Sequence, residues 1–450
     1  MARLAIDLAP ASTLRHDARL RARERRQALA TTIVVAVAAG FPLIRTSNLF
    51  SASTVRDTNY AEGSVLLPVV FGSIFMLAAW VLWMNRQTAL RNLRALNPFL
   101  LLILLWCACT AFWSPYPVTT VKRTVQLAGL ILIGLAVAPP LGNLARFAGT
   151  VLSTFTVLLF LCLLVALALP QVGVDYQLGG AWRGIFWHKN IMGIVSAFTV
   201  LLWLRQWRES RLDWRVCLAG GLFALMMLVL AKSTTSLIIA MTGSALYLFL
   251  ARDYVRGRHV TAIAVLGAAL LAMLGLHLFY SVMGRLPYWE ELVGPIAGLF
   301  NKSADLTGRM DIWQLVALEI AKHPWQGIGY GAYWLGVGSP SQYAIDILHY
   351  IPLQAHNGYL DVLNELGLIG LALVAAMLAW HAWQLARLIR IDRAEGAFHW
   401  AFFVLIVIAN ISESILFRGV QFEYFWLICS SAMVSARLRL HRQALADARP

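Results

Sequence analysis

The strongest constraint on the fold is a set of long apolar runs that recur along most of this 450-residue chain. A helix needs roughly 20 mainly apolar residues to cross the hydrocarbon core of a bilayer. About twelve runs approach that length, at 30–44, 64–84, 97–113, 124–140, 147–170, 190–204, 216–231, 234–250, 260–281, 358–383, 398–415 and 419–435. They are continuous, whereas the strands of a membrane β-barrel alternate between apolar and polar residues. The sequence therefore predicts an all-α polytopic membrane protein with about twelve transmembrane helices.

The distribution of basic residues indicates how these spans are oriented. The chain has 37 Lys and Arg against 22 Asp and Glu, and a net charge of +15 could also indicate a nucleic-acid partner. With the N-terminus inside and the spans alternating, however, the cytoplasmic segments hold 25 of the 37 basic residues. Such an excess is typical of cytoplasmic loops in membrane proteins. We therefore expect a lipid membrane around the chain, both termini in the cytoplasm and no nucleic-acid partner.

The spans divide the chain into five parts. These are a basic cytoplasmic tail at 1–29, spans one to nine at 30–281, a large outer loop at 282–357, spans ten to twelve at 358–435 and a cytoplasmic tail at 436–450. The outer loop is too long to be a simple connector, and loops of this length usually carry function. It is therefore the first place to look for a site.

This outer loop contains a helix signal of its own. Thr307 is a candidate N-cap and Pro324 a stop, and apolar residues between them recur at helical spacing, at Ile312, Leu315, Val316 and Ile320. We expect this helix to lie along the outer membrane surface. The GIGYG that follows resembles a dinucleotide loop only superficially, because it comes after a helix rather than a strand. We expect no nucleotide or other cofactor.

The cysteines do not indicate a disulfide framework or a metal site. All five lie in or next to spans, and none lies in the large outer loop: Cys107, Cys109, Cys162, Cys217 and Cys429. Their spacing does not match a metal motif. His349 and His356 are seven residues apart, and neither outer cysteines nor paired carboxylates accompany them. We therefore expect no bound metal.

Four basic side chains on the outer side occupy short segments beside apolar runs: Arg183, Lys189, Lys232 and Arg309. A charge in hydrocarbon costs about 2.5–3.5 kcal/mol on insertion scales, so such groups usually face a cavity or a partner. For any one of them, snorkelling or pairing with a carboxylate is the alternative. Because they share one sign and come from three loops, we expect them to bind an anion. A lipid pyrophosphate would present such a group at this depth.

Polar and aromatic neighbours of these residues are candidate supporting groups or glycan contacts: His188, Asn190, Asn357, Tyr330 and Trp334. Aromatic side chains also gather at membrane interfaces without contacting a substrate. Both interpretations stay open for Tyr330 and Trp334.

His356 lies where the large outer loop enters the span that follows. If this segment is helical, Gly367 and Gly370 share a face with His356, and such small residues let a neighbouring helix approach closely. Asp361 and Glu365 fall off this face and are not its natural partners. Histidine can act as a general base near neutral pH. The alternative is an interfacial histidine bonded to the backbone.

Three stretches in this order resemble the bacterial superfamily of O-antigen ligases and of O-antigen and exopolysaccharide polymerases: RGIFWHKNIMG, TGRMDIWQLVALEIAKHPWQGIGYG and HNGYLDVLNELGLIGL. The first is most similar to the exopolysaccharide-polymerase branch. The third fits a ligase pattern of a histidine, ten residues and a glycine, from His356 to Gly367. A polymerase pattern of an arginine, ten residues and a glycine is not met, because isoleucine follows Arg183 and Arg309 at that spacing.

This resemblance implies a GT-C-like membrane core with its active site on the periplasmic side of the bacterial inner membrane. Such proteins transfer an undecaprenyl-pyrophosphate-linked glycan to a sugar hydroxyl without a nucleotide sugar or a metal. His356 matches the catalytic histidine of the superfamily, Arg183 and Arg309 match its phosphate-contacting arginines, and Lys232 matches a basic hairpin residue. A chain-length regulator often accompanies the polymerases.

We therefore expect a polysaccharide polymerase that joins lipid-linked repeat units. Ligation of a finished glycan to lipid A-core is the main alternative. A transporter or lipid flippase is a third hypothesis, but those proteins carry charges in a central cavity at mid-membrane. Here the expected spans are nearly free of charge, and basic residues gather at the outer edge.

Overall fold

The computed structural model describes most of the chain: residues 11–44, 66–209, 212–252 and 309–448. The helices in these ranges are α1 (Ala11–Gly40), α2 (Leu66–Met84), α3 (Arg86–Ala95), α4 (Pro98–Cys109), α5 (Pro117–Val137), α6 (Leu144–Ala168), α7 (Pro170–Gly173), α8 (Lys189–Glu209), α9 (Trp214–Leu230), α10 (Thr234–Leu250), α13 (Arg309–Lys322), α14 (Gln342–Leu348), α15 (Gly358–Ile391), α16 (Arg393–Ser412) and α17 (Phe422–Asp447). One short antiparallel pair, β1 (Val174–Asp175) with β2 (Ala181–Trp182), lies in the loop before α8. The prediction of an all-α polytopic membrane protein is confirmed.

The described helices meet the expected spans, but fewer of them are long and apolar enough to cross a membrane. Six pass on length and composition, namely parts of α1 and α16 together with α2, α5, α6 and α15, and the bent pair of α3 and α4 would make a seventh. The helices α9 and α10 are apolar but have only 17 residues each. Polar residues at the ends of α8 and α17 lower their mean hydropathy. The expected span at 260–281 lies outside the described residues.

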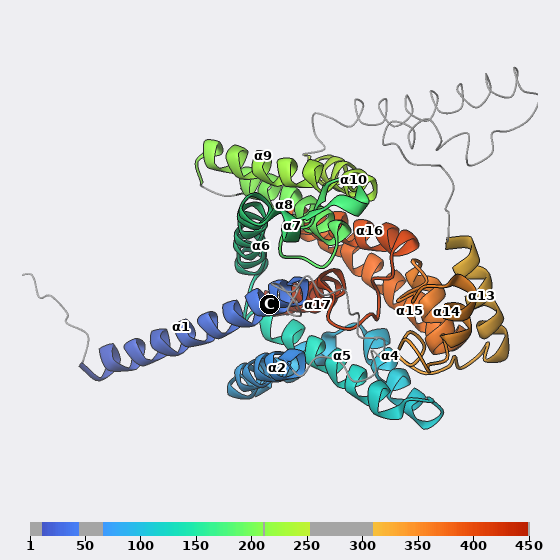
Figure 1. The fold of residues 1–450 in the computed structure, drawn as a ribbon. Coiled ribbons are helices and arrows are strands. Elements are labelled where there is room, and N and C mark those ends of the chain that lie inside the picture. The colour runs from blue at the N-terminus through green and yellow to red at the C-terminus, as the bar shows by residue number, and fades with distance from the viewer. Residues whose placement is uncertain (1–10, 45–65, 210–211, 253–308, 449–450) are drawn as a thin grey trace, which may run out of the picture.

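The last helix, α17, forms the centre of the bundle. Figure 1 shows α17 in the middle of the helices, with α5, α15, α16 and α6 around it. Every residue from 422 to 436 is buried. The ring of Trp426 stacks on Phe402 of α16 at a centroid distance of 4.0 Å, and Phe147 of α6 packs against Trp426 at 4.9 Å. A helix that is buried on all sides must be covered by neighbours on all sides. The surrounding helices therefore account for the low exposure of α17, although its ends are polar.

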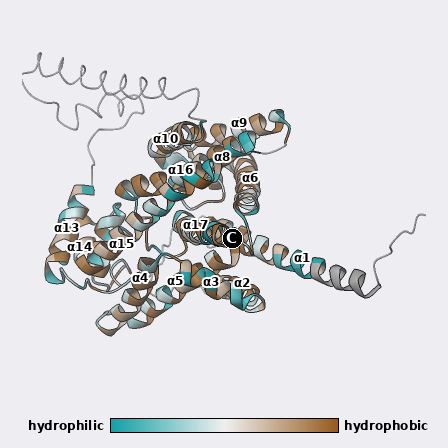
Figure 2. Ribbon diagram, turned by 180° about the vertical axis from the view of Figure 1, so that it is seen from behind, coloured by the Kyte–Doolittle hydropathy of each residue, from teal (hydrophilic) through white to brown (hydrophobic). Residues whose placement is uncertain are grey.

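Large apolar side chains cover the outward faces of the peripheral helices. Trp83 of α2 is 72% exposed, Leu167 of α6 is 65% exposed and Met241 of α10 is 66% exposed. Figure 2 shows the same hydrophobic colouring on helices around the bundle. Water would disfavour so much apolar surface, whereas lipid tails accommodate it. The surface therefore matches the predicted membrane environment.

The predicted helix of the large outer loop is confirmed as α13, which ends two residues before Pro324. Ile312, Leu315 and Val316 are buried as the helical spacing predicts. Ile312 and Val316 pack in a small cluster with Ala355, beside the entry to α15. The candidate N-cap Thr307 lies outside the described residues, as does the part of the loop before Arg309.

The long helix α15 is broken at Gly367, which has φ 69° and ψ −173°. The sequence analysis placed Gly367 on a continuous helix face, as a site of close helix approach, and this was wrong. A Cβ atom at Gly367 would lie 2.2 Å from the carbonyl oxygen of Trp325. A positive φ and a backbone neighbour this close both require glycine. Gly367 therefore allows another segment of backbone to enter the helix.

That segment is the turn at residues 324–329. Its backbone makes four hydrogen bonds across the break: Leu368 N to Pro324 O at 2.9 Å, Ile369 N to Trp325 O at 3.2 Å, Ile328 N to Asn364 O at 3.0 Å and Gly329 N to Glu365 O at 2.9 Å. Two indole N–H groups also donate to the region, from Trp106 to Leu366 O at 3.0 Å and from Trp113 to Gly327 O at 3.1 Å. The backbone N–H and C=O groups that the break leaves without partners inside α15 are therefore hydrogen-bonded to this turn and to the two indoles, as buried groups must be.

We expect Gly367→Ala to destabilise the protein strongly. The positive φ alone costs about 1–3 kcal/mol for a residue with a Cβ, and the added atom overlaps the Trp325 carbonyl. The measurement is the apparent unfolding temperature in detergent. The matched control is Gly149→Ala in α6, where a Cβ would meet no atom within 4 Å. Equal unfolding temperatures for the two variants would contradict this explanation of the break.

Candidate active site

His356 immediately precedes the N-cap of α15. Its backbone has φ 52°, in the left-handed region that few residues other than glycine adopt. The next residue, Asn357, is the N-cap, and its side-chain oxygen accepts from the backbone N–H groups of Tyr359 at 3.1 Å and Leu360 at 3.2 Å. The structure therefore gives Asn357 the role of fixing the start of α15. Its predicted role beside a glycan is not supported by these contacts.

The imidazole of His356 is held by a carboxylate that the sequence analysis did not select. Nδ1 of His356 lies 3.2 Å from Oε2 of Glu413, which stands between α16 and α17. The amide of Gln354 donates to the same oxygen at 3.0 Å. The amide nitrogen of Gln354 also lies 3.1 Å from Nδ1. When Nδ1 carries the proton, it donates to Glu413 and leaves Nε2 as the basic nitrogen. The His356 side chain is 37% exposed, so another molecule can reach it.

The other carboxylate oxygen of Glu413 collects residues from two more loops. Nη2 of Arg309, at the start of α13, lies 3.6 Å from Oε1. The side-chain amide of Asn190 donates to Oε1 at 3.3 Å. Three of the predicted site residues, His356, Arg309 and Asn190, therefore meet around one side chain. They come from three separate segments of the chain.

The charge on Glu413 is stabilised by this environment. Burial alone would raise the pKa of its carboxyl group, but the hydrogen bond and charge of His356, together with Arg309 and His188, lower it overall. The pKa of His188 is itself lowered, chiefly by burial and despite the nearby charge of Glu413. At neutral pH the site therefore holds an ionised Glu413 beside a neutral His188.

Arg183 and Lys232 make contacts within and to the loop before α8. Arg183 pairs with Asp175 at 3.6 Å and donates through Nε to Val172 O at 3.0 Å. Lys232 donates to the carbonyl of Gly179 at 2.6 Å. These are the carboxylate and backbone pairings that the sequence analysis kept as the alternative. They link the loop to the tight hairpin before α10.

This loop is still next to the His356 group. His188 follows it, and its pKa responds to Asp175 as well as to Glu413 and His356. Lys189, the next residue, begins α8. The predicted basic residues therefore form two adjacent groups rather than one cluster. Arg309 belongs to the group around Glu413, while Arg183 and Lys232 support the loop.

The two aromatic candidates are buried. Tyr330 is 1% exposed and packs against Phe417, and Trp334 is 4% exposed with its indole N–H donating to Asp361 at 2.7 Å. Neither offers a face to a sugar here, and their contacts are those of supporting groups. A glycan contact stays a prediction.

Four helices begin around Glu413. They are α8 at Lys189, α13 at Arg309, α15 at Gly358 and α10 at Thr234. The last of them joins through Ser233, whose hydroxyl donates to the side-chain oxygen of Asn190 at 3.4 Å. Each helix N-terminus is the positive end of a dipole, although the first backbone N–H groups of α8 and α15 already bond to His188 and Asn357. Convergent N-termini favour an anion at this place.

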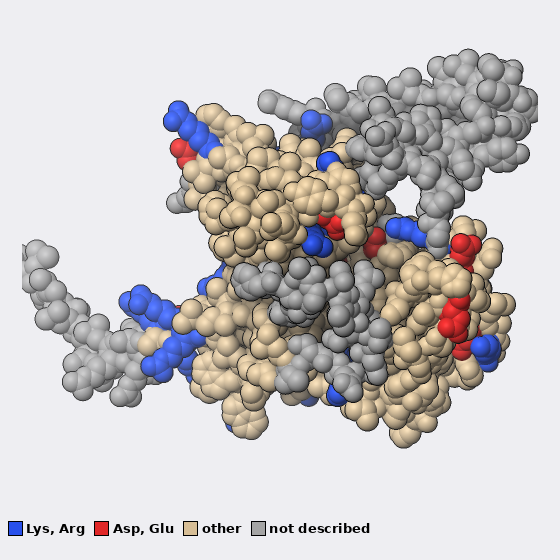
Figure 3. All heavy atoms as spheres, viewed as in Figure 1, with Lys and Arg blue, Asp and Glu red and all other residues tan. Residues whose placement is uncertain are grey.

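The position of the group is also visible on the surface. In Figure 3, basic and acidic atoms lie together near the middle of the face, between the part that carries α8 to α10 and the part that carries α13. Most of the remaining surface in this view is uncharged. Among the described residues, no three His, Cys, Asp or Glu side chains are arranged to hold a metal ion.

Comparison with known proteins agrees with the resemblance found in the sequence. The family model described as O-antigen ligase matches residues 219–375, a range that contains Arg309 and His356. The chain is also 27% identical over 314 residues to the exopolysaccharide production protein ExoQ of Rhizobium meliloti (strain 1021), across 66% of this chain and 68% of that protein. Both comparisons support the resemblance of this chain to the superfamily of O-antigen ligases and polysaccharide polymerases.

Proposed function

We propose that this protein is a polysaccharide polymerase of the bacterial inner membrane. It transfers an undecaprenyl-pyrophosphate-linked glycan to a sugar hydroxyl of another lipid-linked repeat unit, on the periplasmic face. The observation that carries the proposal is the contact of 3.2 Å between His356 Nδ1 and Glu413. It leaves the second ring nitrogen basic, beside a place that favours an anion.

The donor pyrophosphate binds where the helix N-termini converge. Arg309 contributes a planar fork of donors suited to phosphate oxygens. Lys189 lies at the start of α8, next to the same place, and Arg183 and Lys232 add positive charge from the neighbouring loop. These charges stabilise the pyrophosphate as negative charge builds up on it. Pyrophosphate with its charge neutralised is already a good leaving group.

His356 acts as the general base. Its Nε2 takes the proton from the acceptor hydroxyl while the hydroxyl oxygen attacks C1 of the donor sugar. The bond from C1 to the phosphate oxygen breaks, and the pyrophosphate leaves with the electron pair. Glu413 stabilises the imidazolium that forms, as a buried carboxylate does in other histidine dyads. Direct attack inverts the configuration at C1.

Ligation to lipid A-core uses the same chemistry with a different acceptor. The similarity to a protein of exopolysaccharide production favours polymerisation, whereas the matching family model is described as O-antigen ligase. A transporter fits less well. Transporters hold their ionisable residues in a cavity at mid-membrane, whereas the ionisable residues of this site lie at helix ends.

The test of this function uses purified protein in detergent with EDTA and only the undecaprenyl-pyrophosphate-linked repeat unit as substrate. We expect a ladder of products on a gel from the wild type and none from His356→Ala, because the acceptor proton then has no base. His323→Ala is the matched control, since His323 is exposed at the far end of α13. A ladder from His356→Ala would contradict the base. A single transfer that needs lipid A-core would identify a ligase.

We expect Glu413→Gln to lower kcat by about 10²–10⁴-fold, because a neutral amide no longer stabilises the imidazolium. The lowered pKa of Glu413 also stabilises the fold. That contribution is complete above the ordinary carboxyl pKa of 4.5 and is lost as the pH falls through the lower folded value. As the pH falls through this range, the stability of the wild type should therefore drop by this contribution, and that of Glu413→Gln should not.

The measurements are the rate of product formation and the unfolding temperature as a function of pH. The control is Glu395→Gln, at the opposite end of α16. A Glu413→Gln variant with the wild-type rate would remove Glu413 from the mechanism.

We expect Arg309→Lys to raise the KM for the lipid-linked donor about tenfold, because lysine loses the bidentate geometry but keeps the charge. Initial rates at varied donor concentration measure this. Arg208→Lys is the control, about 30 Å away along α8 from its start, where the guanidinium contacts only the carbonyl of Ala251. An unchanged KM would show that Arg309 does not hold the donor.

A further inference from the structure

A second charged group lies directly behind His356 and takes no part in the proton transfer described above. It consists of Arg418 from the loop between α16 and α17, and Asp361 and Glu365 from the first turns of α15. Both carboxylates lie 4.0 Å from Nη1 of Arg418. The side chain of Arg418 is only 13% exposed, although the residue lies in a loop.

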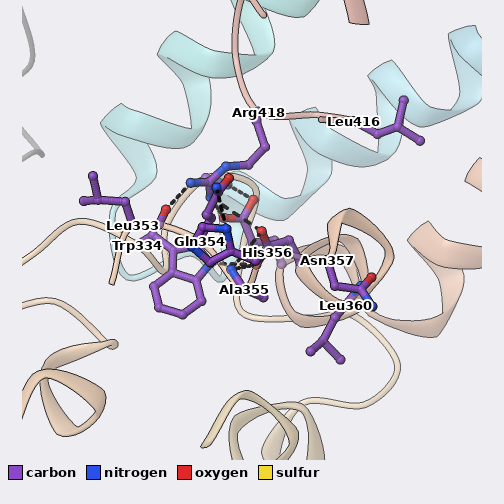
Figure 4. Close-up of polar contacts among 12 residues, drawn as sticks. Trp334, Leu353, Gln354, Ala355, His356, Asn357, Leu360, Leu416 and Arg418 are labelled. Carbon is purple, nitrogen blue, oxygen red and sulfur yellow. Dashed lines mark hydrogen bonds and ion pairs between the residues drawn. The ribbon is translucent and has the colours of Figure 1, made fainter. Parts of the chain in front are cut away.

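These side chains hold the backbone that leads to His356. Nη2 of Arg418 donates to the carbonyl oxygen of Leu353, and Figure 4 shows this contact beside His356. Asp361 accepts from the backbone N–H of Ala355 at 3.2 Å and 3.3 Å through its two oxygens. Ala355 is completely buried. The segment 353–355 is therefore fixed from both sides.

The need for this fixing comes from His356 itself. A left-handed φ of 52° is unfavourable for histidine, and such conformations persist only when the surroundings enforce them. The residue that follows, Asn357, is held in place as the N-cap of α15. Arg418 and Asp361 fix Leu353 and Ala355, which lie shortly before His356.

Further contacts keep the two fixing residues in place. The indole N–H of Trp334 donates to Asp361 at 2.7 Å. The Arg418 loop is folded back by Asn410, whose side-chain oxygen accepts from the backbone N–H groups of Ile415 and Leu416 at 3.0 Å each. Phe417 and Gly419 on either side of Arg418 both have positive φ. The loop is thus shaped to direct Arg418 inward.

We infer that Arg418 and Asp361 are positioning residues for the general base. They act through the peptide 353–356 and hold the His356 imidazole at the angle that Glu413 and the acceptor hydroxyl require. This inference rests on the proposed function of His356. Glu413 and Arg418 lie five residues apart, so a single loop controls both the charge and the orientation of the imidazole.

The test is the rate and donor dependence of Arg418→Lys and Asp361→Asn. Lysine keeps the charge but cannot span Leu353 and the carboxylates at once, and asparagine keeps the shape but replaces one acceptor oxygen with a donor group. We expect kcat per folded molecule to fall about 10- to 100-fold, because small displacements of a catalytic group have such effects. The KM for the donor should change less than about twofold, since Arg309 still holds it.

The matched control is Arg437→Lys, which alters another arginine shared by two carboxylates, Asp392 and Glu395, at the opposite end of the bundle. The double variant of Arg418 and Asp361 should lose little more activity than either single variant, because both act on one peptide. A purely structural role would lower the unfolding temperature and leave kcat per folded molecule unchanged. If Arg418→Lys does not fold, Asp361→Asn supplies the same comparison.

Two results would overturn the inference. Unchanged kcat in both variants would show that the backbone needs no such support. A raised KM with unchanged kcat would show that Arg418 contacts the donor directly. Failure of the proposed function is distinguishable, because His356→Ala would then remain as active as the wild type in the same assay.

Discussion

The structure depends on one backbone requirement: inside a bilayer, every N–H and C=O group must find a partner within the protein. The break in α15 at Gly367 would leave such groups unpaired, and the turn at 324–329 supplies partners for them. This exchange ties the outer loop to the membrane bundle at a fixed depth. Helix α13 ends next to that turn, so the same bonds determine where Arg309 can lie. The position of the site is thus a consequence of backbone pairing within a membrane helix.

Glu413 ties separate segments together through side chains, as the turn at 324–329 does through backbone hydrogen bonds. Its two oxygens contact four residues, Arg309, Asn190, Gln354 and His356, and these come from three separate segments. An isolated carboxylate there would be unfavourable, because burial raises its pKa. The hydrogen bond with His356 and the charge of Arg309 reverse that effect and keep it charged. Arg309 is therefore already paired with a carboxylate in this structure, and any anion that binds there competes with Glu413 for it.

The sequence predicted the parts of this structure that rest on periodicity. Apolar runs located the helices, helical spacing and Pro324 located α13, and the exposed histidine at the entry to α15 was selected as the base. Glu413 was missed because a lone carboxylate in a short loop has no local signal, and only the fold brings it to His356. Gly367 was misread for a related reason, since a helix face and a helix break both favour glycine. For Tyr330 and Trp334 the sequence left two roles open, because the burial of an aromatic residue in a loop cannot be read from the sequence.

The central position of α17 bears on how the protein matures. This helix follows α16 in the chain, yet it fills the middle of the bundle and is buried on all sides. The loop that precedes it carries both Glu413 and Arg418. During synthesis, the earlier helices enter the membrane before either residue can reach His356. A nascent chain that has not yet received α17 therefore holds His356 without its carboxylate partner, and the group around Glu413 is complete only once the whole bundle has formed.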